Sequence, residues 1–184
     1  DKEIVWKYAT PNQGPGGPFG PGGPGGVRPG DIFPVFLQDT LRMTDDQKDK
    51  LDPDAEDVVN FIRGKDPDGS GNRDNMLGDI VHSAVVFIDD VVYVGANDGM
   101  LHAFSAKYGT EIFGYVPYLV FDHLKDLADP DYDHRFYVDL TPTVQKGQSL
   151  LGRPGDQVIL VGGLGKGGMG YFALDITNPL AMSA

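Results

Sequence analysis

The chain has 184 residues, of which 40% are hydrophobic, so it is long enough to bury the core of one sizeable domain. Acidic residues outnumber basic residues by 27 to 15, and the resulting formal charge of −12 repels nucleic acid phosphates and anionic lipid. The chain has no cysteine, which excludes disulfides, thiolate zinc sites and c-type haem attachment. We therefore expect a folded domain with no nucleic-acid partner.

The longest apolar runs, 84–88 and 158–161, have the length of strands and are far shorter than the roughly 20 residues that cross a bilayer. The first ten residues begin with charge and lack a basic segment followed by an apolar one. We predict no membrane span and see no signal peptide.

Residues 1–13 contain a short predicted strand, Glu3 to Tyr8, which is rich in β-formers and needs a partner sheet. In residues 14–30, glycine recurs at every third position from Gly14 to Gly26 and is mostly followed by proline, as in collagen. The run is too short for a stable triple helix, and its small side chains bury little surface. The composition favours an extended polyproline II linker, with packing against another chain as the alternative.

Residues 31–83 are predicted to form a helical lead-in. Thr44 to Gln47 has the form of a capping box and opens a helix that runs to about Leu51. Asp52 caps a second helix, which Gly64 ends.

Residues 84–184 change to short β-rich runs separated by turn residues, with an inserted amphipathic helix at 117–128. The first group of runs is 84–88, 91–95, 100–105 and 111–115, and the second is 135–139, 143–145, 157–162 and 170–176. Antiparallel strands joined by such tight turns are typical of a propeller blade.

The predicted fold class is therefore mainly β: a partial β-propeller of about two blades of antiparallel four-stranded sheet, with a few short helices. A closed propeller has about four to eight blades, so two blades leave open strand edges. We expect these edges to be covered by the remainder of a longer chain or by a partner chain.

The segment from Val92 to Phe104 (VYVGANDGMLHAF) resembles the blade repeat of pyrroloquinoline quinone type propellers. Further segments occur in an order similar to that of the C-terminal domain of the type IV pilus tip adhesin and biogenesis family, the PilC and PilY group. These segments are FIRG (61–64), LGDIVHS (77–83), YVD (137–139) followed by Thr141-Pro142, GGLGKGG (162–168) and ALDIT (173–177).

This resemblance implies an extracellular protein at the cell surface or pilus tip, with roles in pilus assembly, retraction control or surface adhesion. It also implies calcium dependence, with other pilus or surface-filament proteins as partners. We expect a structural or interaction module and no enzyme. The alternatives are a fragment of a quinoprotein-type dehydrogenase propeller, and a subunit that completes its blades with a partner chain in a surface filament.

A candidate calcium loop follows the second predicted helix. Oxygen-bearing residues recur there at the spacing of a calcium-binding loop, with Gly71 at the sharp turn. The candidate ligands are Asp66, Asp68, Ser70, Asn72 and Asp74. Position 12 of the loop is Leu77, where such loops have a bidentate glutamate, so an acidic turn without a metal is the alternative.

Other candidate sites have simpler interpretations. The glycine-rich run 162–168 lacks the serine or threonine of a phosphate loop and is predicted to be a hairpin loop. His102 is predicted to be a hydrogen-bonded core residue, and Asp98 and Asp139 to make local backbone hydrogen bonds. His82, His123 and His134 lie in separate elements, and the sequence does not bring them together. We predict no catalytic residues and no cofactor other than calcium.

Overall fold

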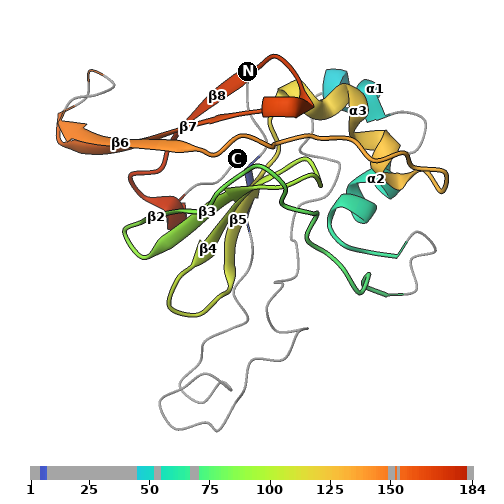
Figure 1. The fold of residues 1–184 in the computed structure, drawn as a ribbon, viewed down its shortest axis with the longest axis horizontal. Helices are drawn as coiled ribbons and strands as arrows, with labels where there is room; N and C mark the ends of the chain where they lie inside the picture. Colours follow the sequence, from blue (N-terminus) through green and yellow to red (C-terminus); the bar gives the residue numbers. More distant parts are fainter. Residues whose placement is uncertain are drawn as a thin grey trace, which may run out of the picture.

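Two antiparallel β-sheets form the body of the computed structural model, which describes residues 5–7, 45–51, 55–66, 71–148, 152 and 154–181 (Figure 1). The first sheet contains β1 (Val5–Lys7), β2 (Val86–Ile88), β3 (Val91–Gly95), β4 (Leu101–Ser105) and β5 (Glu111–Tyr115), in the order β1-β5-β4-β3-β2. The second contains β6 (Thr143–Gln148), β7 (Asp156–Gly163) and β8 (Tyr171–Asp175), in that order. The predicted mainly β class with a partial propeller is confirmed.

The hairpins of the first sheet follow from their turn residues. Asp89 and Asp90 between β2 and β3 have φ values of +49° and +62°, which is the pattern that a type I′ turn requires. Gly99, with φ +92°, closes the β3–β4 turn. The pairing of β4 with β5 shifts register at Ala103 and Phe104, which marks a β-bulge.

The N-terminal strand pairs with the far edge of this sheet. β1 runs antiparallel to β5, with Val5 opposite Tyr115 and Lys7 opposite Phe113. The strand predicted at Glu3 to Tyr8 needs a partner sheet, and this pairing shows that the partner is the first sheet. The predicted 14–30 linker and the caps Thr44 and Asp52 lie outside the described residues.

The second sheet has three strands, and the predicted strand at 135–139 is wrong. The backbone of this segment bonds to turns and loops and joins no sheet: Val138 N–H donates to Ala96 O at 3.3 Å, and Asp139 N–H donates to Leu164 O at 3.2 Å. Tyr137 and Val138 are buried, which explains why the segment has the composition of a strand.

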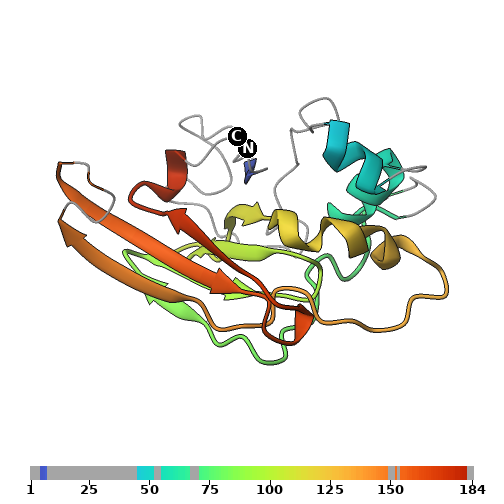
Figure 2. The same ribbon diagram turned by 90° about the horizontal axis from the view of Figure 1, so that it is seen from above.

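Short helices gather at one end of the molecule, as Figures 1 and 2 both show. The two predicted lead-in helices are α1 (Asp45–Leu51) and α2 (Ala55–Ile62). The inserted helix is confirmed as η3 (Tyr118–Val120), α3 (Phe121–Leu124) and η4 (Lys125–Ala128), whose outer parts are 3₁₀-helical. Two further 3₁₀ turns are η5 (Gly165–Gly167) and η6 (Pro179–Ala181).

One hydrophobic core joins the two sheets and the helices. The rings of Tyr115 on β5 and Phe172 on β8 have centroids 5.1 Å apart, so side chains of both sheets are in contact. Val59 of α2 and Leu124 of α3 belong to the same core. Each such buried side chain contributes roughly 1.5–3 kcal/mol, so the helices and sheets stabilise one another. Among the described residues, no helix has both the length and the apolar character needed to cross a bilayer.

Candidate functional site at the junction of the sheets

Several of the segments that carry the family resemblance meet beside the β3–β4 turn. Gly78 N–H donates to Asp98 Oδ2 at 2.7 Å, and Asn97 Nδ2 donates to Asp79 Oδ2 at 2.9 Å. On the other side of the turn, Tyr137 N–H donates to Asn97 Oδ1 at 3.0 Å. The turn residues Asn97 and Asp98 therefore hold segments that come before and after them in the chain.

Asp139 connects the same region to the glycine-rich loop. Its buried carboxylate accepts hydrogen bonds from the backbone N–H of His82 at 3.1 Å and from the ring Nδ1 of His82 at 2.7 Å. Leu140 N–H donates to Gly163 O at 3.3 Å, beside the bond from Asp139 to Leu164. The residues 77–83, 96–98, 137–141 and 163–168 thus form one hydrogen-bonded unit, which we call the junction.

Two glycines of the junction are required by close backbone contacts. A Cβ on Gly78 would lie 2.4 Å from Asp98 N, and a Cβ on Gly167 would lie 2.0 Å from Tyr137 O. Real Cβ atoms do not approach other atoms so closely, so any side chain at either position would push the segments apart. The predicted hairpin loop at 162–168 is therefore a packed loop that contains η5.

A buried charged triad supports the junction from inside the first sheet. The His102 ring lies between Asp98, whose Oδ2 is 3.0 Å from Nε2, and Glu111, which faces Nδ1. Burial alone lowers the pKa of His102, but the two carboxylates outweigh this effect and raise the pKa to about 10. Burial alone raises the pKa of Asp98, but charged His102 and hydrogen bonds from Gly78 and Met100 lower it overall.

The triad bears out the interpretation of His102 as a hydrogen-bonded core residue. Asp98 also accepts the local backbone bond that its turn position predicts, from Met100 N–H at 3.1 Å. Asp139 differs, because its partners lie 57 residues away in the chain. Nothing in the local spacing around Asp139 could have indicated them.

The candidate calcium loop is described only in part. Asp66 N–H donates to Gly71 O at 3.0 Å, and Lys65 forms an isolated bridge with Asn72, so the described ends of the loop are held together. The first and sixth loop positions therefore lie close together. Asp68 and Ser70 lie outside the described residues, and the ligand set stays a prediction. Within the described ranges, no group of three or more acidic, histidine or cysteine residues could hold a metal.

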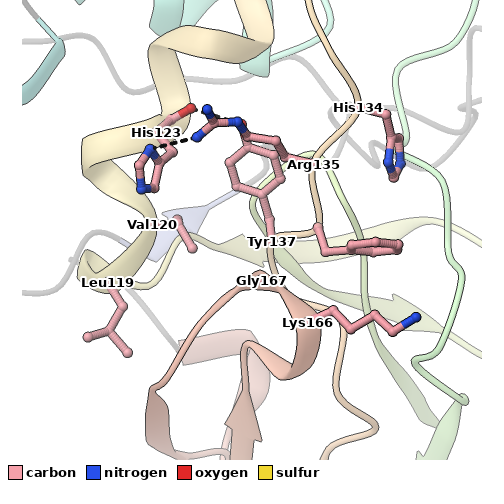
Figure 3. Close-up of a pocket in the computed structure, with 9 residues that line it drawn as sticks. Leu119, Val120, His123, His134, Arg135, Tyr137, Lys166 and Gly167 are labelled. Carbon is pink, nitrogen blue, oxygen red and sulfur yellow. Dashed lines mark hydrogen bonds between the residues drawn. The ribbon is translucent and has the colours of Figure 1, made fainter.

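Two of the three histidines that the sequence leaves in separate elements contribute to one cavity. His123 and His134 line one cavity together with Arg135 and Lys166 (Figure 3). His134 Nε2 lies 3.0 Å from Asp79 Oδ2, which belongs to the junction. Partial burial alone would raise the pKa of Asp79, but hydrogen bonds from Asn97 and His134 lower it.

One histidine of the junction is oriented by a buried carboxylate. Asp139 orients the His82 ring as a general base is oriented in catalytic triads. No described serine, threonine or tyrosine hydroxyl forms a hydrogen bond with the other nitrogen of this ring. The described residues therefore include an oriented imidazole without a paired nucleophile.

Comparison with known proteins identifies similar sequences. The model of the PilY1 beta-propeller domain family matches residues 77–183. The type IV pilus biogenesis factor PilY1 of Pseudomonas aeruginosa (strain UCBPP-PA14) is 34% identical over 172 residues, covering 76% of this chain and 15% of that protein. The corresponding protein of strain PAO1 is 33% identical over 178 residues, covering 77% and 15%.

A second organism provides a comparable match. A PilY1 homolog of Xylella fastidiosa (strain Temecula1) is 36% identical over 157 residues, covering 66% of this chain and 13% of that protein. The chain therefore spans only about 13–15% of the length of these curated relatives. No solved structure matches the chain.

Proposed function

Because the chain belongs to the PilY1 β-propeller domain family, we propose that it is an extracellular structural and interaction module of a type IV pilus-associated tip protein. It supports pilus assembly, retraction control or surface adhesion by binding partners, without catalysis. The family match over residues 77–183 carries this proposal, since that range includes all four segments of the junction. Placement at the cell surface or pilus tip is part of the same proposal.

The rigidity of the junction supports a binding role. Its hydrogen bonds and close glycine contacts fix the loops at one end of both sheets relative to one another. A surface whose loops are held in place loses little conformational freedom when it binds a partner. The junction would therefore present a preorganised surface to other pilus proteins.

The outward face of the second sheet supports a place within a larger propeller. Along β8, Phe172 and Leu174 are buried, whereas Tyr171 is 74% exposed. Val161 of β7, which pairs with Ala173, is 43% exposed on the same outward face. Since the curated relatives are several times longer than this chain, we propose that this apolar face packs against a further blade of the same polypeptide.

A genetic experiment tests the pilus role. In the organism that encodes the chain, the gene is deleted and complemented with the full protein carrying Asp139→Ala or, as the matched control, Asp133→Ala. Asp133 is exposed and lies outside the junction. Deletion and Asp139→Ala should reduce surface pili or twitching, and Asp133→Ala should restore both. Normal piliation, twitching and surface adhesion in the deletion strain would together refute the proposal.

The quinoprotein alternative is distinguished by cofactor retention. The curated relatives are named pilus biogenesis factors, which favours the pilus role. The purified full protein is incubated with pyrroloquinoline quinone and calcium and then desalted. Complete loss of quinone absorbance supports the binding module, and stoichiometric retention supports the dehydrogenase.

We also propose that the loop from Asp66 to Asp74 binds calcium. The closure of the loop between Asp66 and Gly71 supports this proposal, together with the oxygen ligands in its sequence. Equilibrium dialysis at millimolar calcium should show a bound ion that the double variant Asp66→Asn, Asp74→Asn loses. The absence of a bound ion in the unmodified protein would end the proposal.

A further inference from the structure

A cavity of about 320 Å³ opens between the inserted helix, the 134–137 segment and the glycine-rich loop (Figure 3). Leu119, Val120 and Tyr137 contribute apolar surface to it. Its volume suits a ligand the size of a monosaccharide or an amino acid. It lies beside the junction, but no part of the pilus role proposed above depends on it.

The charge of this cavity is opposite to that of the chain. Four basic residues line it, namely His123, His134, Arg135 and Lys166, and no lining residue is acidic. In Figure 3, His123 and Arg135 lie together near the helix, and His134 and Lys166 lie on the other side of the view. In a chain with 27 acidic and 15 basic residues, such a grouping indicates an anionic ligand.

Carboxylates outside the lining hold two of these groups in position. Arg135 Nη1 lies 3.1 Å from Asp126 Oδ2 and 3.1 Å from His123 Nδ1. A guanidinium has five N–H donors, so Arg135 retains donors for a ligand. His134 is fixed in the same way by Asp79.

Lys166 provides a positive charge that no described carboxylate neutralises. Its ammonium lies 5.2 Å from the centroid of the Phe136 ring. The lysine ion pairs found among the described residues involve Lys50 and Lys146, so Lys166 has no carboxylate partner there. Contact with an aromatic face leaves an ammonium free to attract an anion.

We infer that this cavity binds a small organic carboxylate. The guanidinium of Arg135 matches the planar geometry of a carboxylate, and the ammonium of Lys166 adds charge. The apolar wall of Leu119, Val120 and Tyr137 suits the carbon framework of such a ligand, which an inorganic anion lacks.

Titration with matched probes tests this inference. Glucuronate is the probe, glucose is its neutral counterpart and inorganic phosphate is the inorganic anion, each followed by NMR or calorimetry on the whole chain. Glucuronate should bind at millimolar concentration or tighter, at least about tenfold more tightly than glucose, because hydrogen bonds between charged groups are stronger than hydrogen bonds between neutral groups. Equal binding of glucose and glucuronate, binding of phosphate alone, or no binding of any probe would overturn the inference.

Variants locate the binding site. Lys166→Gln and Arg135→Gln should each weaken glucuronate binding about tenfold. Lys107→Gln is the matched control, because Lys107 is exposed on the β4–β5 turn, where its ammonium lies over Tyr108. Circular dichroism confirms that each variant is folded. Unchanged affinity in both cavity variants would overturn the inference even if glucuronate binds.

Discussion

His102 Nε2 lies 3.0 Å from Asp98 Oδ2, across the β3–β4 turn, and both side chains are buried. On its other side the ring faces the buried carboxylate of Glu111. Two buried carboxylates therefore depend on one imidazole, and Asp98 in turn holds Gly78 of the junction. The charge balance of the first sheet and the geometry of the junction are linked through this contact.

Removal of the imidazole tests that link. His102→Ala leaves Asp98 and Glu111 buried without a cation and should lower the free energy of unfolding by about 3–5 kcal/mol. The measurement is urea denaturation at pH 7. The control is His123→Ala, whose exposed side chain should cost no more than about 0.5 kcal/mol. Similar losses in both variants would contradict the role of His102.

The pH dependence of stability provides a second test. The pKa of His102 is raised from 6.5 to about 10 in the folded state. The stabilisation that charged His102 gives to the folded state is therefore complete below pH 6.5 and is lost as the pH rises through about 10. The free energy of unfolding should fall over this range by at most about 1.4 kcal/mol per pH unit.

At acidic pH, the change in stability depends on Asp98. Its pKa is lowered from 3.8, so its contribution is present above pH 3.8 and is lost as the pH falls through the lower value of the folded state. Denaturation between pH 3 and 11 should therefore show both limbs. A curve that is flat between pH 7 and 10 would show that His102 is not charged in the folded state.

The glycine-rich loop offers a steric test. Gly167→Ala would place a Cβ 2.0 Å from Tyr137 O, so the loop or the 137–141 segment must move. We expect a loss of about 1–3 kcal/mol, as for an overpacked site. In Gly71→Ala, the new Cβ makes only an ordinary contact with Asp66, so this control should change stability by less than about 0.5 kcal/mol. Thermal denaturation of both variants measures the difference.

We expect the cost of placing a charge on the outward face of the second sheet to depend on the length of the polypeptide. Val161→Asp should lower the free energy of unfolding of the 184-residue chain by at most about 1 kcal/mol, because Val161 is partly exposed there. In a longer polypeptide with a further blade, the same carboxylate would be buried without a partner and should cost several times more. Thermal denaturation of both polypeptides provides the comparison.

An exposed residue away from this face controls for general effects of the added charge. Tyr108→Asp, on the β4–β5 turn, should have an equally small effect in both polypeptides. Equal effects of Val161→Asp in both polypeptides would show that no blade covers the second sheet.

Local patterns in the sequence account for most of the secondary structure. Turn residues such as Asp89 and Asp90 impose the φ values that the β2–β3 hairpin needs. The capping and apolar spacing predict α1 and α2 close to their observed bounds. These features depend on neighbours within a few residues, so one sequence is sufficient to predict them.

The features that the sequence did not predict correctly depend on contacts between segments that are far apart in the chain. The 135–139 segment has the composition of a strand because Tyr137 and Val138 are buried, but its backbone partners Ala96 and Leu164 lie far away in the chain. The hydrogen bonds that His82 donates to Asp139 and the cavity around Arg135 also depend on segments that are far apart in the chain. Such contacts are set by the packing of the two sheets, and no local spacing encodes them.

The most direct test of the central claim is to determine where the encoded protein is found. Pili are sheared from cells of the organism that encodes this chain, and the fraction is probed with an antibody raised against residues 77–183, the range of the family match. Our account predicts that the protein is present in the pilus fraction of wild-type cells and absent from that of a mutant without pili. Recovery of the protein only from the cytoplasm, with none in the sheared fraction, would contradict it.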